Sequence, residues 1–130
     1  MNINSIDHIV LTVKDIDKTV SFYTTVLAMR VETFGEGRVA LKFGNQKINL
    51  HKQNHEFEPK ANLPTPGSAD LCFITDTPLQ AAMEHVEKCG VEILEGPVQK
   101  TGATNPIISF YFRDPDKNLI EVGTIMRESS

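Results

Sequence analysis

The clearest structural signal lies near the end of the chain, at residues 106–124, which read PIISFYFRDPDKNLIEVGT. Residues 106–112 and 118–124 are rich in β-branched and aromatic side chains, a composition typical of strands. Between them, Asp114-Pro115-Asp116-Lys117 combines residues that favour a turn. The stretch therefore predicts two strands joined by that turn.

The residues before these two strands complete a five-element pattern. Residues 69–75 have the composition of a strand, and Thr77-Pro78 provides an N-cap and a first-turn proline for a helix. That helix is expected to end at Cys89, because Gly90 follows it. Residues 91–94 are predicted as a further strand, so the second half of the chain has the order β-α-β-β-β.

The first half of the chain repeats the same order of elements. Residues 6–13 alternate between apolar and mixed side chains, as a strand does. Asp15 is expected to cap a helix that runs to about residue 28, since apolar residues recur there at helical spacing. Three strands are predicted to follow, at residues 29–33, 38–43 and 47–52.

A proline-containing connector, at residues 53–67, separates the two halves. We therefore expect an α+β fold of two βαβββ modules, at about 1–52 and 68–126, related by a pseudo-two-fold axis. The modules are expected to form a partly open, barrel-like sheet with the helices outside. Since 130 residues is close to the commonest domain size, we expect a single domain over 1–130.

Composition and charge narrow the classes of function. The chain has 23% charged residues, a net charge of −4 and scattered Lys and Arg residues, so a nucleic-acid partner is not expected. The first residues lack the pattern of a signal peptide, and no apolar stretch approaches the ~20 residues that cross a bilayer. We expect a cytoplasmic protein without membrane contact, in which Cys72 and Cys89 are reduced packing residues.

The repeated order of elements makes certain residues of the two modules equivalent. His8 in the first strand matches Asp70 in the fifth, and Asn49 in the fourth strand matches Glu121 in the eighth. The neighbours of Asn49 and Glu121 are apolar and would point to the other face of a strand. We therefore expect these four polar side chains to converge on one cavity. Imidazole, carboxylate and amide oxygen are all competent ligands of a divalent metal ion.

Three motifs carry a resemblance to a known family: DHIVL at residues 7–11, FY at 22–23 and FRDPDKNLIE at 112–121. Together they resemble the vicinal oxygen chelate superfamily, which contains glyoxalase I, bleomycin-resistance and fosfomycin-resistance proteins and extradiol dioxygenases. Residues 43–51 and 57–61 are most similar to its glyoxalase-domain-containing-protein-five subgroup. The resemblance covers nearly the whole chain and implies the fold described above.

The resemblance also implies a divalent metal held by a first-strand His, a fourth-strand residue, a fifth-strand His and an eighth-strand Glu. His8 and Glu121 match this pattern. Asp70 stands where His is usual, and Asn49 stands where Glu, Gln or His is commoner. His51 lies two residues beyond Asn49 on the same strand face and is an alternative ligand. Such an oxygen-rich set favours Mg, Mn, Fe or Ni over a tetrahedral Zn site.

Two residues are expected to contact the substrate. Ser109 and Tyr111 share a strand face and resemble a run that binds phosphonate oxygens in fosfomycin-resistance enzymes. However, Val10 stands where those enzymes carry a Thr, and the sequence shows no cluster of Lys and Arg suited to a phosphonate. Fosfomycin transfer is therefore not the expected reaction.

Two functions of different classes remain open. In the first, the protein with its metal is a lyase or isomerase for a small oxygenated molecule, and Glu121 moves a proton. In the second, the cavity sequesters a small molecule without turnover and without metal, as some resistance proteins of the superfamily do. Chelation would abolish activity in the first case and leave ligand affinity intact in the second. The resemblance also implies a two-fold homodimer.

Overall fold

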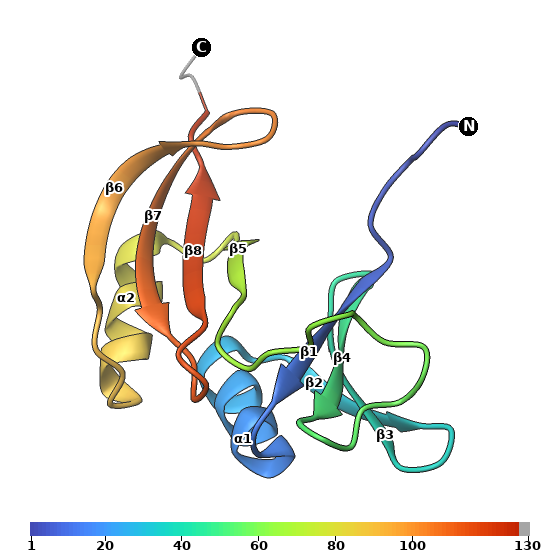
Figure 1. Ribbon diagram of the computed structural model, residues 1–130. Coiled ribbons are helices and arrows are strands. Elements are labelled where there is room, and N and C mark those ends of the chain that lie inside the picture. The colour runs from blue at the N-terminus through green and yellow to red at the C-terminus, as the bar shows by residue number, and fades with distance from the viewer. Residues whose placement is uncertain (128–130) are drawn as a thin grey trace. The chain divides into compact units, whose positions relative to one another are not determined.

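The protein, as a computed structural model, is described over residues 1–127 and divides into two compact units (Figure 1). Module 1 extends from Met1 to Ser68, and module 2 begins at Ala69. Module 1 consists of β1 (His8–Val13), α1 (Ile16–Leu27), β2 (Arg30–Phe34), β3 (Arg38–Phe43) and β4 (Gln46–Lys52). Module 2 consists of β5 (Asp70–Ile74), α2 (Leu79–Lys88), β6 (Glu95–Thr101), β7 (Pro106–Arg113) and β8 (Leu119–Ile125). The predicted α+β fold of two βαβββ modules is confirmed.

Each module builds a four-stranded mixed sheet with the same topology. The strand order is β1-β4-β3-β2 in module 1 and β5-β8-β7-β6 in module 2. In both sheets the first strand of the module pairs in parallel with the last, and the other neighbours are antiparallel. Over residues 1–127, each of the two sheets stays open and forms no closed barrel.

One face of each sheet packs against the helix of its own module and forms the core. In module 1, Leu11 and Ile48 of the sheet are buried together with Tyr23 of α1. In module 2, Phe110 and Ile120 are fully buried on the corresponding face. Each such side chain contributes about 1.5–3 kcal/mol when fully buried. No helix within residues 1–127 has the length and apolar character needed to span a membrane.

The other face of each sheet carries the polar residues that the sequence singled out, and we call it the site face. Strand register defines it, because neighbouring residues in register point to the same side. In module 1 it includes the register pairs His8 with Lys47, Val10 with Asn49 and Thr12 with His51. In module 2 it includes Glu121, which lies between Cys72 and Tyr111.

The N-cap predicted from the sequence is confirmed for α1 and wrong for α2. Asp15 Oδ1 accepts the backbone N–H of Lys18 at 2.9 Å, so the predicted cap of α1 is confirmed. The predicted cap of α2 by Thr77 is wrong, because Pro78 occupies the N-cap position. The Thr77 backbone N–H instead donates to Thr75 Oγ1 at 3.1 Å, which stabilises a local turn before the helix.

The strand predicted at residues 91–94 is also wrong, since β6 begins only at Glu95. Gly96 and Pro97 lie inside this strand, although both residue types disfavour strand interiors. A register shift between Glu95 and Val98 accommodates them. β6 is also an edge strand, with a neighbouring strand on one side only. The bulge and the proline therefore remove few ladder hydrogen bonds, and their loss costs little folding free energy.

Candidate functional site

A carboxylate lies at the centre of the site face of module 2. Glu121 is half-buried in β8, with Cys72 of β5 and Tyr111 of β7 as its register partners. Ser109 Oγ donates a hydrogen bond of 2.6 Å to Glu121 Oε2. Gly123 is in register with Ser109, and a Cβ at position 123 would lie 3.0 Å from Ser109 Cβ. The glycine therefore keeps open the space that the buried Ser109 side chain uses.

Two further protic groups lie beside the same carboxylate. Cys72 and Tyr111 are the register neighbours of Glu121 on β5 and β7, and the pKa values of both groups respond to its carboxylate. Loss of hydration raises the pKa of both groups, and the Glu121 carboxylate raises it further because it repels their ionised forms. The pKa of the Cys72 thiol reaches about 11. Both groups therefore keep their protons at neutral pH.

Two hollows on the site face of module 2 give access to Glu121 and Tyr111. The larger, of about 460 Å³, is also lined by Lys100 and by residues 101–105. The other, of about 440 Å³, also contains Asp70. Lys100 Nζ lies 5.7 Å from the centre of the Tyr111 ring, so a cation and a carboxylate border the larger hollow. A small polar molecule bound there would meet both charges.

His8 and Asn49, on the site face of module 1, are arranged in a way that suits a metal ion. His8 Nδ1–H donates to Asp7 Oδ1 at 2.8 Å, a contact that lowers the pKa of Asp7. In the neutral ring, this bond leaves the lone pair of His8 Nε2 available. Asn49 is 8% exposed, and among residues 1–127 its buried Oδ1 has no hydrogen-bond partner. Its register partners, Val10 and Ala40, have no polar side chain that reaches it.

These features fit the divalent ion that the sequence predicts. A buried carboxamide oxygen without a partner is costly, and a cation would satisfy it. His8, Asp70 and Glu121 supply an imidazole and two carboxylates of the kind that complete such a donor set. Within either module, residues 1–127 contain no cluster of three His, Cys, Asp or Glu side chains placed to hold a metal. The predicted set takes two residues from each module and stays a prediction.

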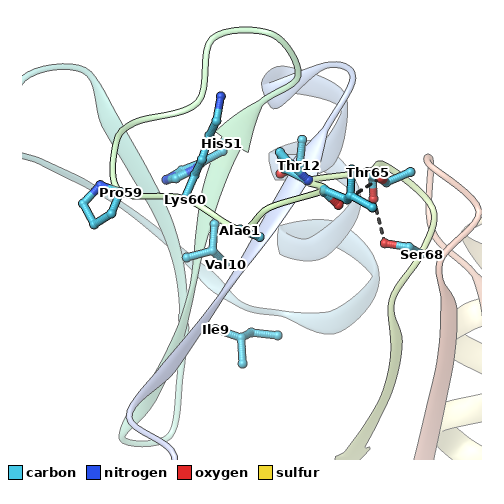
Figure 2. Close-up of a pocket in the computed structure, with 11 residues that line it drawn as sticks. Ile9, Val10, Thr12, His51, Pro59, Lys60, Ala61, Thr65 and Ser68 are labelled. Carbon is cyan, nitrogen blue, oxygen red and sulfur yellow. Dashed lines mark hydrogen bonds between the residues drawn. The ribbon is translucent and has the colours of Figure 1, made fainter.

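His51 lies at the end of the site face of module 1, where the connector folds back (Figure 2). It is 4% exposed, and its ring meets Phe57 of the connector edge-on, with 5.6 Å between centroids. Burial lowers the pKa of His51, and the charges of Arg38 and Lys60 lower it further, against an opposing effect of Glu56. The imidazole is therefore neutral at pH 7. Its predicted role as an alternative metal ligand is untested.

The sequence does not predict Cys72 as a site residue, although Cys72 is the register partner of Glu121 on β5. Cys72 and Cys89 are free cysteines, as expected, but Cys72 is exposed on the site face. The signal was present in the sequence, because Cys72 follows Asp70 by two residues and so shares its strand face. The sequence does not predict Lys100 as a site residue, because Lys100 lies in β6, whose predicted position was wrong.

Comparison with known proteins identifies the family. Residues 5–122 match the Glyoxalase/Bleomycin resistance protein/Dioxygenase superfamily. The chain belongs to this superfamily. Virulence protein STM3117 of Salmonella typhimurium is 58% identical to it over 123 residues, which cover 95% of this chain and 85% of that protein. The predicted superfamily is thus confirmed, while the predicted subgroup stays a prediction.

One solved structure and one more distant relative are also similar to this glyoxalase-superfamily chain. Integron cassette protein VCH_CASS1 of V. cholerae is 63% identical, with a TM-score of 0.94 over 95% of this chain and 97% of that one. Metallothiol transferase FosB of Shouchella clausii is 28% identical over 123 residues, covering 94% of this chain and 81% of that protein. The solved structure therefore has the fold of this chain.

The environment of Cys72 predicts slow alkylation. In a Cys89→Ser background without metal, iodoacetamide at pH 8 should modify Cys72 about a hundredfold more slowly than an ordinary exposed thiol, because little thiolate forms. Glu121→Gln should accelerate the reaction, since it removes the charge that repels the thiolate. Glu92→Gln, at an exposed carboxylate of the same module, is the control. Equal rates in all three proteins would contradict the contact between Cys72 and Glu121.

Proposed function

We propose that this superfamily member is a metal-dependent lyase or isomerase for a small oxygenated molecule, acting in the cytoplasm as a homodimer. The observation that carries the proposal is the Glu121 carboxylate, which lies in an apolar strand, faces two hollows and is fixed by Ser109 at 2.6 Å. A half-buried carboxylate in such a strand is costly unless it has a function or partners. Its placement suits a group that exchanges protons with a bound molecule.

His8, Asn49, Asp70 and Glu121 are the residues that would hold the metal, with His51 as the alternative to Asn49. Their oxygen-rich chemistry suits Mg, Mn, Fe or Ni better than Zn. When bound, the ion would polarise a substrate carbonyl or a pair of neighbouring oxygens. The name of the relative FosB, a metallothiol transferase, is consistent with a metal in this family.

In this proposal Glu121 is the base of the reaction. Its Oε1, the oxygen that Ser109 does not contact, takes a proton from the substrate carbon next to a carbonyl. The electron pair of the broken C–H bond forms a C=C bond, and the electrons of the carbonyl bond move to its oxygen. In an isomerase the first carbon also carries a hydroxyl: Glu121 returns its proton to the former carbonyl carbon, the hydroxyl oxygen becomes the new carbonyl, and the hydroxyl proton passes to the other oxygen. Tyr111 borders both hollows and contacts the substrate. Ser109 is fully buried and holds Glu121, so its predicted direct contact with substrate stays a prediction.

Metal content and metal binding test this proposal. We expect protein purified without chelator to carry near-stoichiometric divalent metal, and calorimetric titration of the chelated protein with Ni, Mn, Fe and Zn to restore it. His8→Ala/Glu121→Ala should lose metal uptake, because it removes an imidazole and a carboxylate from the set. His55→Ala/Glu87→Ala removes the same two groups from exposed positions and should bind like the wild type. Wild-type protein that is metal-free and takes up no metal would overturn the proposal.

Metal-free sequestration is the second candidate function, and one observation favours it. Glu121 accepts a hydrogen bond from Ser109 and has the protonated Cys72 and Tyr111 groups as register neighbours, so it is stabilised without an ion. In that case a small molecule would bind in the hollows without turnover. Its affinity would be unchanged by chelation, whereas the activity of a metal enzyme would be lost.

A further inference from the structure

Module 1 contains a cavity of its own, of about 590 Å³. It lies between the site face and the connector, and its walls come from β1, β4 and the residues that follow β4 (Figure 2). All the lining residues belong to module 1, and Glu121 is not among them. Its volume falls in the range of small-molecule sites, which is about 300–1,000 Å³.

Two polar side chains of the sheet face this cavity with unused hydrogen-bonding capacity. His51 lines it, yet among residues 1–127 neither ring nitrogen of His51 has a hydrogen-bond partner. A neutral imidazole offers one N–H donor and one acceptor, and neither ring nitrogen of His51 belongs to the fully buried polar atoms without a partner in residues 1–127, so both groups are open to a ligand in the cavity. Thr12 is in register with His51 and also lines the cavity, so it offers a hydroxyl on the same sheet face as the imidazole.

Two cations, Arg38 and Lys60, lie near His51, and the Glu56 carboxylate opposes their effect on the imidazole. Lys60 lines the cavity beside His51, and its Nζ makes only a half-exposed ion pair of 3.4 Å with Glu58. Arg38 stacks at 4.7 Å from the centre of the Phe57 ring, which itself contacts His51. The carboxylate of a bound ligand near Lys60 would replace the weak surface ion pair between Lys60 and Glu58. The new ion pair would be partly shielded from water and therefore stronger than the exposed one.

The rest of the wall is apolar. Val10 and Leu63 line the cavity with much of their surface exposed to solvent, and Ile9 and Ala61 lie on the same wall. Exposed apolar surface in a concave site gains free energy when a ligand covers it, at about 25 cal/mol per Å². The cavity therefore combines one cationic and hydrogen-bonding end with an apolar body.

We propose that the cavity of module 1 binds a small carboxylate with an apolar body, with its carboxylate on Lys60, His51 and Thr12. Its apolar part covers Val10 and Leu63. This site goes beyond the proposed function, because it lies wholly in module 1 and needs neither Glu121 nor a metal. In this site His51 acts as a hydrogen-bonding group.

A matched pair of probes tests the site by NMR titration of chelator-treated, isotope-labelled protein. We expect 4-phenylbutyrate to shift the resonances of His51, Thr12 and Val10, and 4-phenylbutan-1-ol to bind about tenfold more weakly because it lacks the charge. Lys60→Gln should weaken 4-phenylbutyrate about fivefold and leave the alcohol unchanged. Lys52→Gln, at an exposed lysine of β4 outside the cavity, should bind like the wild type.

Three outcomes would overturn the site. These are equal affinity for acid and alcohol, shifts confined to Tyr111 and Glu121 of module 2, and no shifts at millimolar probe. Because the titration is done without metal, its result is independent of the test of the metal-dependent activity. The protein can bind the carboxylate probe without taking up metal, and it can take up metal without binding the probe.

Discussion

Asp114→Ala is expected to destabilise module 2 by roughly 3 kcal/mol or more, because it leaves buried donors without an acceptor. Asp114 is 5% exposed, and its carboxylate accepts the backbone N–H groups of Asp116 and Asn118 at 2.9 Å. It also accepts the side-chain amide of Asn118 at 2.8 Å. Asn118 is 1% exposed, so water cannot replace the lost oxygen.

The effect should extend beyond the turn itself. Asn118 Oδ1 accepts the backbone N–H of Ala69 at 2.9 Å, which ties the start of β5 to the start of β8. An Asn118 side chain released by the mutation would loosen this link, and with it the parallel pair that carries Asp70 and Glu121. The turn therefore supports the candidate site without belonging to it.

Urea unfolding followed by far-ultraviolet circular dichroism measures the loss. Asp76→Ala, at an exposed aspartate of the same module, is the control and should change the unfolding free energy by less than about 0.5 kcal/mol. A loss below about 1 kcal/mol for Asp114→Ala would show that the three hydrogen bonds contribute little to stability.

The features that the sequence predicts well depend on local chemistry. The turn at Asp114 was expected from its residue types, and the structure shows Lys117 N–H donating to Asp114 O at 2.9 Å. The start of α1 was expected because Asp15 is a good capping residue in front of a helical pattern. The alternation of apolar and polar residues in β8 placed Glu121 on the face opposite the core, where the structure has it.

The features that the sequence does not predict depend on contacts between distant segments. The position of β6 is set by its pairing with β7, and that pairing overrides the local preference of Gly96 and Pro97. The bond from Ser109 to Glu121 depends on the space left by Gly123, which no single-strand pattern reveals. The cavity of module 1 depends on how the connector folds back over β1 and β4.

Gly96→Ala is expected to destabilise module 2 by roughly 3–5 kcal/mol, through a clash that no side-chain rotation relieves. A Cβ at position 96 would lie 2.5 Å from Phe110 Cβ, 2.7 Å from Phe110 Cα and 2.9 Å from Ser109 O. Phe110 is fully buried, so it cannot move away from the bulge. The φ angle of Gly96, +129°, adds backbone strain for any residue with a side chain.

Gly90→Ala separates the two causes, because Gly90 also has a positive φ, +80°, but a Cβ there would meet nothing within 4 Å. We expect it to cost about 1 kcal/mol in the same urea experiment, from backbone strain alone. Equal losses of unfolding free energy in Gly96→Ala and Gly90→Ala would show that the close approach of β6 to β7 contributes nothing to stability. A larger loss at Gly96, together with shifted Ser109 and Glu121 resonances, would show that this approach fixes Ser109 and, through it, the carboxylate of the candidate site.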